Sequence, residues 1–509
     1  MVGEMGLELS YDKQLKGKNG YKVYQTDANG YALVDGTLRE KDPTNGNDLY
    51  LTIDSGLQRN LDYLMSNAYS ESGAEVVTAG VMEIKTGKIL AMSTYPSFNP
   101  NERNISTFNN YFLEGTIECG SVFKPFIYAD SIEEGKYDHN AYYNSGSYNV
   151  YYGNKLVATI KDHNGGQGWG TITYDQGLYH SSNVAICNLL DQGYVTKDVL
   201  TEKLNDLGFF QGDTMDGLTC SSSINAYTRK NAGRLEYLTT GFGQGSTVTP
   251  YQLLKAYSVF GNDGKTVQPH IVDKVVNPKT NKVVYQATPK YSKQIFSTNT
   301  ISQVKDLMLG VIEDEQGTGK TYRLDNDVRM IGKTGTGQVV ENGGYSTTLY
   351  MHSFVGIAPY DDPQVVMFLT FKSGDSYAQY MPNIVKQTMN EALQVVNRYN
   401  AKNTTAVDQS YTLDSYTNQS VNYVKSKLES KSLSVQIIGN GSSVIEQYPL
   451  AKSKVTSGDK VFIKTEGKDI TLPNLIGWSK KEVQTYASLA GIQLTIDGTS
   501  GHVTAQSVG

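Results

Sequence analysis

Three short polar motifs follow one another along the chain, and together they contain the side chains that acyl transfer through a serine requires. They are Ser121-Val122-Phe123-Lys124, Ser181-Ser182-Asn183 and Lys333-Thr334-Gly335-Thr336. Enzymes that use these three motifs in this order take an acyl group from a peptide or β-lactam carbonyl. Each string is common by itself, so the prediction depends on the ordered set.

The spacing of Ser121 and Lys124 predicts the start of a helix, because residues three apart share one face of a helix. A serine hydroxyl is a weak nucleophile and needs a base within hydrogen-bond reach. Lys124 can be this base only if burial or neighbouring cations lower its pKa. Gly120 would free the turn into the helix, and Pro125 predicts a local distortion. A helix N-terminus would also favour a developing alkoxide on Ser121.

The Ser-x-Asn motif predicts a proton relay beside a substrate contact. Ser181 can pass a proton between lysines and the leaving amine. Asn183 offers both a donor and an acceptor to a substrate amide. We interpret the preceding His180 as a neighbour that shapes the cleft rather than as a base.

Residues 328–336 are predicted to form one strand that binds the end of the substrate. Lys333 would supply positive charge, Thr334 and Thr336 would hold a terminal carboxylate, and Gly335 would let a substrate backbone approach closely. The backbone N–H groups of Ser121 and Thr336 are the expected oxyanion-hole pair.

Two similar strings are predicted to be structural. Lys85-Thr86-Gly87 repeats the Lys-Thr-Gly pattern between two apolar runs, so we expect a hairpin turn there. Residues 317–321 read Gly-Thr-Gly-Lys-Thr, but Asp314 occupies the first glycine position of a phosphate loop and no hydrophobic strand precedes it.

Beyond these motifs, the chain resembles the class B penicillin-binding proteins. Four more segments match the family in the expected order: Asp48–Gln58, Lys85–Pro100, Gly241–Gly245 with Thr249-Pro250, and His352–Pro359. The resemblance implies an α/β multidomain chain with the penicillin-binding and serine β-lactamase-like transpeptidase fold, an antiparallel sheet flanked by helices. The nucleophile would lie at a helix start between the sheet and a helical subdomain.

The resemblance also implies a function: a D,D-transpeptidase that cross-links peptidoglycan stem peptides and is acylated by β-lactams. It implies a glycosyltransferase of the SEDS type as partner and a membrane anchor at the N-terminus. Two rival classes stay open. One is a hydrolase, either a D,D-carboxypeptidase or a β-lactamase; the other is a non-enzyme, either a β-lactam sensor or a wall-binding scaffold.

Cys119 is a departure from the family, which usually carries proline at this position. Beside a helix N-terminus we expect a reactive, redox-sensitive thiol there. We expect no metal or other cofactor; a zinc site of Cys119 with His180 or Cys187 is the alternative.

Composition limits the partners of the chain. Its net charge of −6 and pI near 5.7 argue against nucleic acid. No stretch approaches 18 apolar residues and the first residues do not resemble a signal peptide. We therefore expect a soluble fragment that lacks its anchor and most of its pedestal, from a protein at the extracytoplasmic face of the membrane or in the cell wall.

The expected domain order has five parts. Residues 1–47 would be the pedestal remnant, 48–400 the transpeptidase domain, 401–410 a polar linker, and 411–468 and 469–509 two small α+β PASTA modules. The modules follow from an internal repeat, because Leu433–Gln447 aligns without gaps on Ile492–Gln506. Each copy is predicted as a helix followed by two strands, and the second copy looks shortened.

Overall fold

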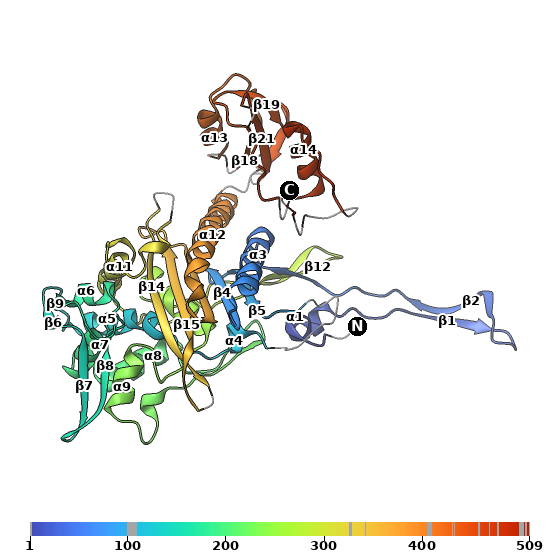
Figure 1. Ribbon diagram of the computed structural model, residues 1–509. Helices are drawn as coiled ribbons and strands as arrows, with labels where there is room; N and C mark the ends of the chain where they lie inside the picture. Colours follow the sequence, from blue (N-terminus) through green and yellow to red (C-terminus); the bar gives the residue numbers. More distant parts are fainter. Residues whose placement is uncertain are drawn as a thin grey trace. The chain divides into compact units, whose positions relative to one another are not determined.

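The computed structural model describes residues 3–98, 109–324, 328–341, 343–404, 410–429, 431, 433–456, 459–467, 469–475, 478–497, 503 and 506–507. The chain forms two compact units, Met1–Leu393 and Gln394–Gly509 (Figure 1). Each unit is described by itself.

A five-stranded antiparallel sheet forms the centre of the first unit, with the strand order β14-β15-β16-β4-β5. Its strands are β4 (Val76–Glu83), β5 (Ile89–Tyr95), β14 (Ile331–Glu341), β15 (Gly344–Ala358) and β16 (Val365–Ser373). The Lys85-Thr86-Gly87 string lies in the turn between β4 and β5, as predicted, and Gly87 has a φ of +80°. The third motif lies on β14, which begins at Ile331 rather than at residue 328.

Two amphipathic helices, one near each end of the first unit's sequence, accompany this sheet. Helix α3 (Ser55–Ser72) begins at Asp54, whose side chain accepts the N–H groups of Gly56 and Leu57, and it packs on β4 and β5 (Figure 1). Helix α12 (Met381–Thr404) continues through residues 401–404, which were expected to begin the linker. Polar side chains do not end a helix by themselves, because alanine and lysine favour it and a formed helix propagates easily. The apolar positions that repeat at helical spacing along the two helices are buried: Leu57, Leu61, Leu64, Ala68, Val385, Met389, Leu393 and Val396.

The helical side of the first unit shares one apolar core with the sheet. Alternation along β16 directs Val366 and Phe368 into this core, and the equally buried Val365 and Met367 point the other way. Helix α11 packs on β14 and α10 packs on β16 and β4. The main helices are α5 (Lys124–Glu133), α6 (Tyr174–Tyr179), α7 (Asn183–Asp191), α8 (Lys197–Asp206), α9 (Arg234–Gly241), α10 (Pro250–Tyr257) and α11 (Thr298–Glu313).

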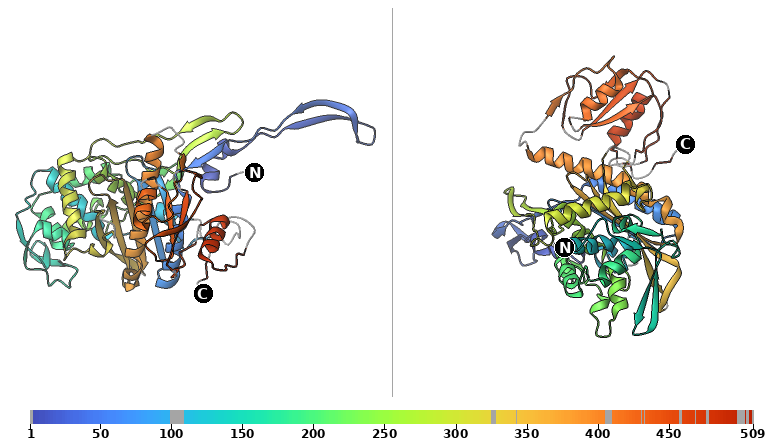
Figure 2. Two further views of the ribbon diagram at one scale, coloured as in Figure 1. Left: turned by 90° about the horizontal axis from the view of Figure 1, so that it is seen from above. Right: turned by 90° about the vertical axis from the view of Figure 1, so that its left-hand side faces the viewer.

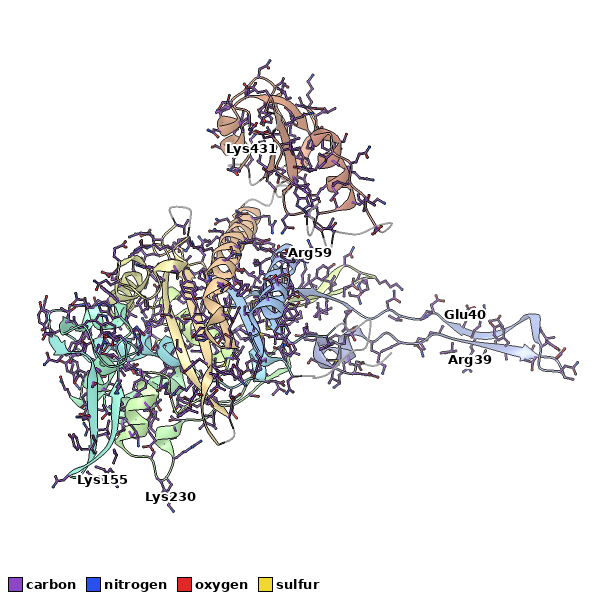
Figure 3. All side chains as sticks on the ribbon, viewed as in Figure 1. Arg39, Glu40, Arg59, Lys155, Lys230 and Lys431 are labelled. Atoms are coloured by element: carbon purple, nitrogen blue, oxygen red, sulfur yellow. The ribbon has the colours of Figure 1, made fainter. Side chains whose placement is uncertain are left out.

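Shorter elements complete the first unit, and Figure 2 shows the unit from two further directions. The short helices are α1 (Gly6–Ser10), α2 (Asp12–Leu15) and α4 (Tyr111–Glu114). The minor strands are β1 (Tyr21–Thr26), β2 (Ala32–Lys41), β3 (Asp48–Leu51), β6 (Tyr142–Asn144), β7 (Ser147–Tyr152), β8 (Lys155–Lys161), β9 (Thr171–Thr173), β10 (Asp213–Met215), β11 (Leu218–Cys220), β12 (Val272–Asn277) and β13 (Lys282–Gln286). Strands β1 and β2 form an antiparallel pair, and the side chains of Arg39 and Glu40 project from β2 (Figure 3).

The second unit contains the first sequence repeat, folded as predicted. Helix α13 (Val421–Glu429) precedes β18 (Ser434–Ile438) and β19 (Val444–Tyr448). Both strands pair with β21 (Lys460–Thr465) in the order β18-β21-β19, while β17 (Ser410–Thr412) pairs with β20 (Lys454–Thr456).

The second repeat forms its helix, α14 (Lys480–Ala490), but residues 492–497 are not a strand as predicted. In the first repeat, β18 and β19 do not pair with each other; each needs β21 as its partner. The second strand predicted for the second repeat falls within residues 498–506, most of which lie outside the described ranges. Helix α14 instead packs through Val483 and Tyr486 against Phe462 of β21 and Ile438 of β18.

Candidate active site

Ser121 lies on a single turn of 3-10 helix, η1 (Gly120–Phe123), which runs directly into α5. The segment is therefore helical from Gly120 onward, as the Ser121–Lys124 spacing predicts. The expected distortion takes the form of the tighter first turn, and Pro125 falls at the start of α5, where its missing N–H breaks no helical hydrogen bond.

Glycines at four positions let the nucleophile turn pack directly on its neighbours. Gly120 has a φ of +61°, and its N–H donates to the Gly243 carbonyl at 3.0 Å. A Cβ on Gly337 would lie 1.7 Å from the Glu118 carbonyl oxygen, and one on Gly335 would lie 2.7 Å from that of Cys119. Backbone thus meets backbone between η1, β14 and the 241–245 loop, which brings the Ser121 turn close to the Thr336 backbone.

Gly335 has a packing role in addition to lining the cleft. Its missing side chain makes room for the turn that carries Ser121, since the added Cβ would also lie 3.0 Å from the Val122 side chain. The close neighbour of Gly335 within the folded protein is thus a segment that is distant from it in the sequence. The approach of a substrate backbone to Gly335 stays a prediction.

Ser181 occupies the sharp connection between α6 and α7. It has a φ of +59°, a left-handed conformation that is uncommon for a residue other than glycine. The next residue, Ser182, caps α7 by accepting the N–H of Ala185, and Asn183 is the first residue of that helix. This connection turns both the carbonyl and the hydroxyl of Ser181 toward two lysines.

Lys124 and Lys333 meet at the Ser181 hydroxyl, although they are far apart in the sequence. Lys333 donates to Ser181 Oγ at 2.8 Å, and Lys124 Nζ lies 3.4 Å from the same oxygen. Lys124 also donates to the Ser181 carbonyl at 2.5 Å and to Asn183 Oδ1 at 2.8 Å. The geometry thus joins four of the predicted catalytic side chains in one hydrogen-bonded cluster.

Both lysines are fully buried, and this changes their acidity. Burial lowers the pKa of Lys124 to about 7, and the charge of Asp162 opposes that shift. Burial, and secondarily the charge of Lys124, lower the pKa of Lys333 well below its ordinary value. A neutral lysine that can accept a proton is therefore accessible near neutral pH, which is the condition that the base role of Lys124 requires.

Asp162 is a site residue that the motifs do not reveal. It directly follows β8 and is 1% exposed. Its Oδ1 accepts from Ser182 Oγ at 2.8 Å and from the Asn183 and Val184 N–H groups at 2.7 and 3.1 Å, and its Oδ2 accepts the Gly146 N–H at 2.8 Å. It therefore anchors the N-terminus of α7 and supplies a negative charge that acts on Lys124. A lone aspartate after a short strand gave no signal in the sequence.

A cleft of about 950 Å³ opens beside this cluster. Ser121, Ser181, Asn183, Thr334, Gly335 and Thr336 line it, and so do residues that the sequence did not identify: His163, Phe242, Gln244, Thr318, Gln338, His352 and Tyr377. Thr318, from the segment resembling a phosphate loop, accepts a hydrogen bond from the Thr334 hydroxyl at 2.9 Å. The cleft therefore places the nucleophile, the hydroxyl shared by the two lysines and the Thr-Gly-Thr strand around one space.

Cys119 does not have the reactive character expected for it. The side chain is 1% exposed, and burial raises the pKa of its thiol well above the usual value. Cys187 and Cys220 are also buried and free. Over the described part of the chain, no group of three or more His, Cys, Asp or Glu side chains could hold a metal ion.

Solved structures share this fold. Penicillin Binding Protein 2X from Streptococcus thermophilus superposes with a TM-score of 0.69 at 25% identity, covering 100% of this chain and 76% of its own. The transpeptidase domain of Burkholderia pseudomallei penicillin-binding protein 3 superposes with a TM-score of 0.57 at 23% identity, covering 68% of this chain and 96% of its own. The sheet, its helices and the cleft thus have the architecture of penicillin-binding transpeptidase domains.

Sequence comparisons agree. The family profile of the penicillin binding protein transpeptidase domain matches residues 77–394, the penicillin-binding protein dimerisation domain matches 1–51, and the PASTA domain matches 411–467. Stage V sporulation protein D of Bacillus subtilis is 30% identical over 487 residues, which cover 92% of this chain and 73% of that protein. Probable peptidoglycan D,D-transpeptidase PenA of Neisseria flavescens is 28% identical over 411 residues, covering 77% and 94%. The chain belongs to the class B penicillin-binding proteins with a C-terminal PASTA domain.

Proposed function

We propose that this protein is a peptidoglycan D,D-transpeptidase that works through an acyl-enzyme on Ser121. The observation that carries the proposal is the Ser181 hydroxyl held between Lys124 and Lys333, both buried, in the cleft that Ser121 lines. The names of the relatives, which include peptidoglycan D,D-transpeptidases, support the choice of substrate.

In the first half-reaction, Ser121 Oγ attacks the carbonyl of the penultimate D-Ala, and its proton passes to neutral Lys124. The C–N bond to the terminal D-Ala breaks, and the amine leaves with a proton relayed through Ser181. In the second half-reaction, an amine of a neighbouring stem attacks the ester, loses a proton along the same relay and releases Ser121 Oγ–H. β-Lactams would acylate the same oxygen.

The remaining roles follow from position. Lys333 acts through its hydrogen bond to Ser181 Oγ and supplies positive charge in its protonated form. Asn183 binds a substrate amide, and Thr334 and Thr336 hold the terminal carboxylate. The backbone N–H groups of Ser121 and Thr336 would stabilise the oxyanion, which the glycine-lined contact between η1 and β14 supports.

We further propose the wider setting that the family implies: residues 1–47 as part of a pedestal, 48–400 as the catalytic domain, 411–468 and 469–509 as PASTA modules, a SEDS-type glycosyltransferase partner, and an N-terminal membrane anchor at the extracytoplasmic face. No helix in the described ranges is long and apolar enough to cross a membrane.

Labelled penicillin tests the nucleophile. The protein should form one covalent adduct, and mass spectrometry of a digest should locate it on the peptide containing Ser121. Ser121→Ala should abolish the adduct. An adduct on another residue, or one that persists in Ser121→Ala, would refute the assignment.

A chromogenic cephalosporin separates the transpeptidase from its hydrolytic rival. A transpeptidase should give one burst of product equal to the enzyme concentration, because its β-lactam acyl-enzyme hydrolyses slowly. Sustained turnover would instead identify a β-lactamase or carboxypeptidase.

A further inference from the structure

A second, smaller cavity of about 330 Å³ lies next to the catalytic cleft. His163, Trp169, His180, Gln316 and Thr318 line it. His163 and Thr318 also line the catalytic cleft, so the two spaces share a wall. Nothing in the proposed half-reactions so far uses this cavity.

Ring stacking and hydrogen bonds hold the aromatic wall of the cavity in place. The Trp169 and His180 rings stack, with their centroids 4.5 Å apart and an angle of 8° between the ring planes. The centroid of the His163 ring lies 5.4 Å from that of Trp169. Asn164 closes the intervening loop by bonding both the N–H and the carbonyl of Gly168. The backbone N–H of Trp169 donates to Ser145 Oγ at 2.6 Å. The indole is therefore held in place by both its backbone and its ring.

The chemistry of the wall favours one kind of ligand. Partial burial lowers the pKa of His163 and of His180, so both rings are neutral at neutral pH. None of the five lining residues then carries a charge that would bind a carboxylate. Aromatic faces bind alkyl chains and cationic amines, while Gln316 and Thr318 can hydrogen-bond an amide.

The cavity also lies on the side of the cleft where the leaving group departs. Thr334, which is proposed to hold the terminal carboxylate, donates to the Thr318 hydroxyl at 2.9 Å, and Thr318 belongs to both spaces. The acceptor amine must attack the same carbonyl carbon from the position that the leaving amine vacated, because the two half-reactions are the reverse of each other at that carbon. An incoming stem therefore has to pass this wall.

From this juxtaposition we propose that the His163–Trp169–His180 cavity is the acceptor subsite, where the aliphatic, amine-bearing side chain of the second stem peptide lies before it attacks the acyl-enzyme. The proposal rests on the proposed transpeptidase function. Trp169 and His180 act here as binding residues for the acceptor, and the acylation half-reaction does not need them.

The test uses the full chain, a D-alanyl thioester as donor, and two acceptors. Nα-Acetyl-L-lysine amide presents an aliphatic amine that needs the cavity, whereas D-alanine is the leaving group itself and needs only the carboxylate site. In Trp169→Ala, the ratio of aminolysis to hydrolysis with the lysine amide should fall roughly ten-fold, as expected for losing one aromatic contact of about 1–2 kcal/mol. With D-alanine, the ratio of aminolysis to hydrolysis in Trp169→Ala should stay within about two-fold of that of the unaltered protein. The rate of thioester consumption should stay within the same range.

Two further variants serve as controls. Trp169→Phe keeps an aromatic face and should retain most of the aminolysis with the lysine amide. Tyr152→Ala removes an exposed aromatic side chain beside Lys155 at the far end of the β7–β8 hairpin, and it should change neither ratio (Figure 3).

The outcomes separate this proposal from the one on which it rests. Equal losses with both acceptors, a parallel loss of thioester consumption, or no loss at all in Trp169→Ala would overturn the acceptor subsite. Failure of the unaltered protein to form an acyl-enzyme with the thioester would instead overturn the proposed function.

Discussion

The central feature at the scale of residues is a serine hydroxyl shared by two buried lysines. Burial disfavours the charge on each lysine, and the charge of Lys124 further disfavours that of Lys333, so the pKa of both lysines is lowered. Asp162 limits the shift of Lys124. The base is thereby poised near neutral pH and does not remain a permanent cation.

We predict that the rate of β-lactam acylation rises with pH and levels off above the pKa of Lys124, which lies at about 7. The base must be neutral to accept the Ser121 proton, so activity is lost as the pH falls through this value.

Lys124→Arg should lose acylation by orders of magnitude, because arginine stays protonated. Lys333→Arg should keep a measurable part, because its proposed role needs only charge. Stopped-flow rates from pH 5.5 to 9 measure this, and the reverse order of the two variants would refute the assignment.

We predict a different pH effect for Asp162→Asn. The carboxylate raises the pKa of Lys124, so its removal should move the midpoint of the acylation profile to lower pH. The asparagine amide would also face the Gly146 N–H, donor against donor, if its oxygen keeps the helix α7 contacts. This should lower the free energy of unfolding by about 1–3 kcal/mol.

Urea denaturation and the acylation profile measure the two effects of Asp162→Asn. Asp206→Asn is the matched control, because its surface ion pair with Lys293 should contribute little. An unchanged midpoint in Asp162→Asn would show that its charge does not act on Lys124.

The motifs predicted the residues that we propose to be reactive, but not the residues that support them. Ser121, Lys124, Ser181, Asn183 and Lys333 were predicted because the chemistry demands particular residue types at short spacings. The buried anchor Asp162 and the cleft residue Thr318 were not identified, because ordinary residue types come to the site only through the packing of distant elements. The burial of Cys119 has the same cause. Strand β14 packs on the turn that contains Cys119, and the neighbouring residues in the sequence do not reveal this contact.

At the scale of elements, the site depends on how closely η1 packs on β14. The contact is backbone on backbone, so it fixes the position of Ser121 relative to the Lys-Thr-Gly strand more rigidly than side chains would. The family resemblance predicted an antiparallel sheet flanked by helices, and local patterns predicted the hairpin turn at Lys85–Gly87, the strand of the third motif and the helix that begins at Ser121. The close approach of η1 to β14 was not, because glycine spacing does not reveal which segment fills the free space.

We predict that Gly335→Ala impairs acylation without unfolding the protein. The new methyl would lie 2.7 Å from the Cys119 carbonyl oxygen, so the nucleophile turn must shift. A displacement of about 1 Å can cost roughly 100-fold in rate. Gly344→Ala, on β15, meets nothing within 4 Å and should leave the acylation rate unchanged. Stopped-flow acylation and circular dichroism measure both variants, and normal acylation in Gly335→Ala would show that the contact is not tight.

At the scale of the whole molecule, the chain contains two compact units with separate apolar cores. All the motif residues and every residue lining the two cavities belong to the first unit. In the second unit, the first repeat has a three-stranded sheet, one face of which packs on the helix of the second repeat. The repeat predicted both helices, but the pairing of β18 and β19 through β21 was not visible in the alignment.

We therefore predict that a shortened chain ending after Thr404, which keeps α12 entire, acylates with penicillin at close to the full rate. The proposed chemistry needs only groups that come before this point. The same chain should bind isolated peptidoglycan less well if the PASTA region contributes to wall binding. Acylation kinetics and pelleting with peptidoglycan measure the two properties, and circular dichroism checks that the shortened chain is folded. A large loss of acylation rate in the folded, shortened chain would mean that the second unit helps to shape the cleft.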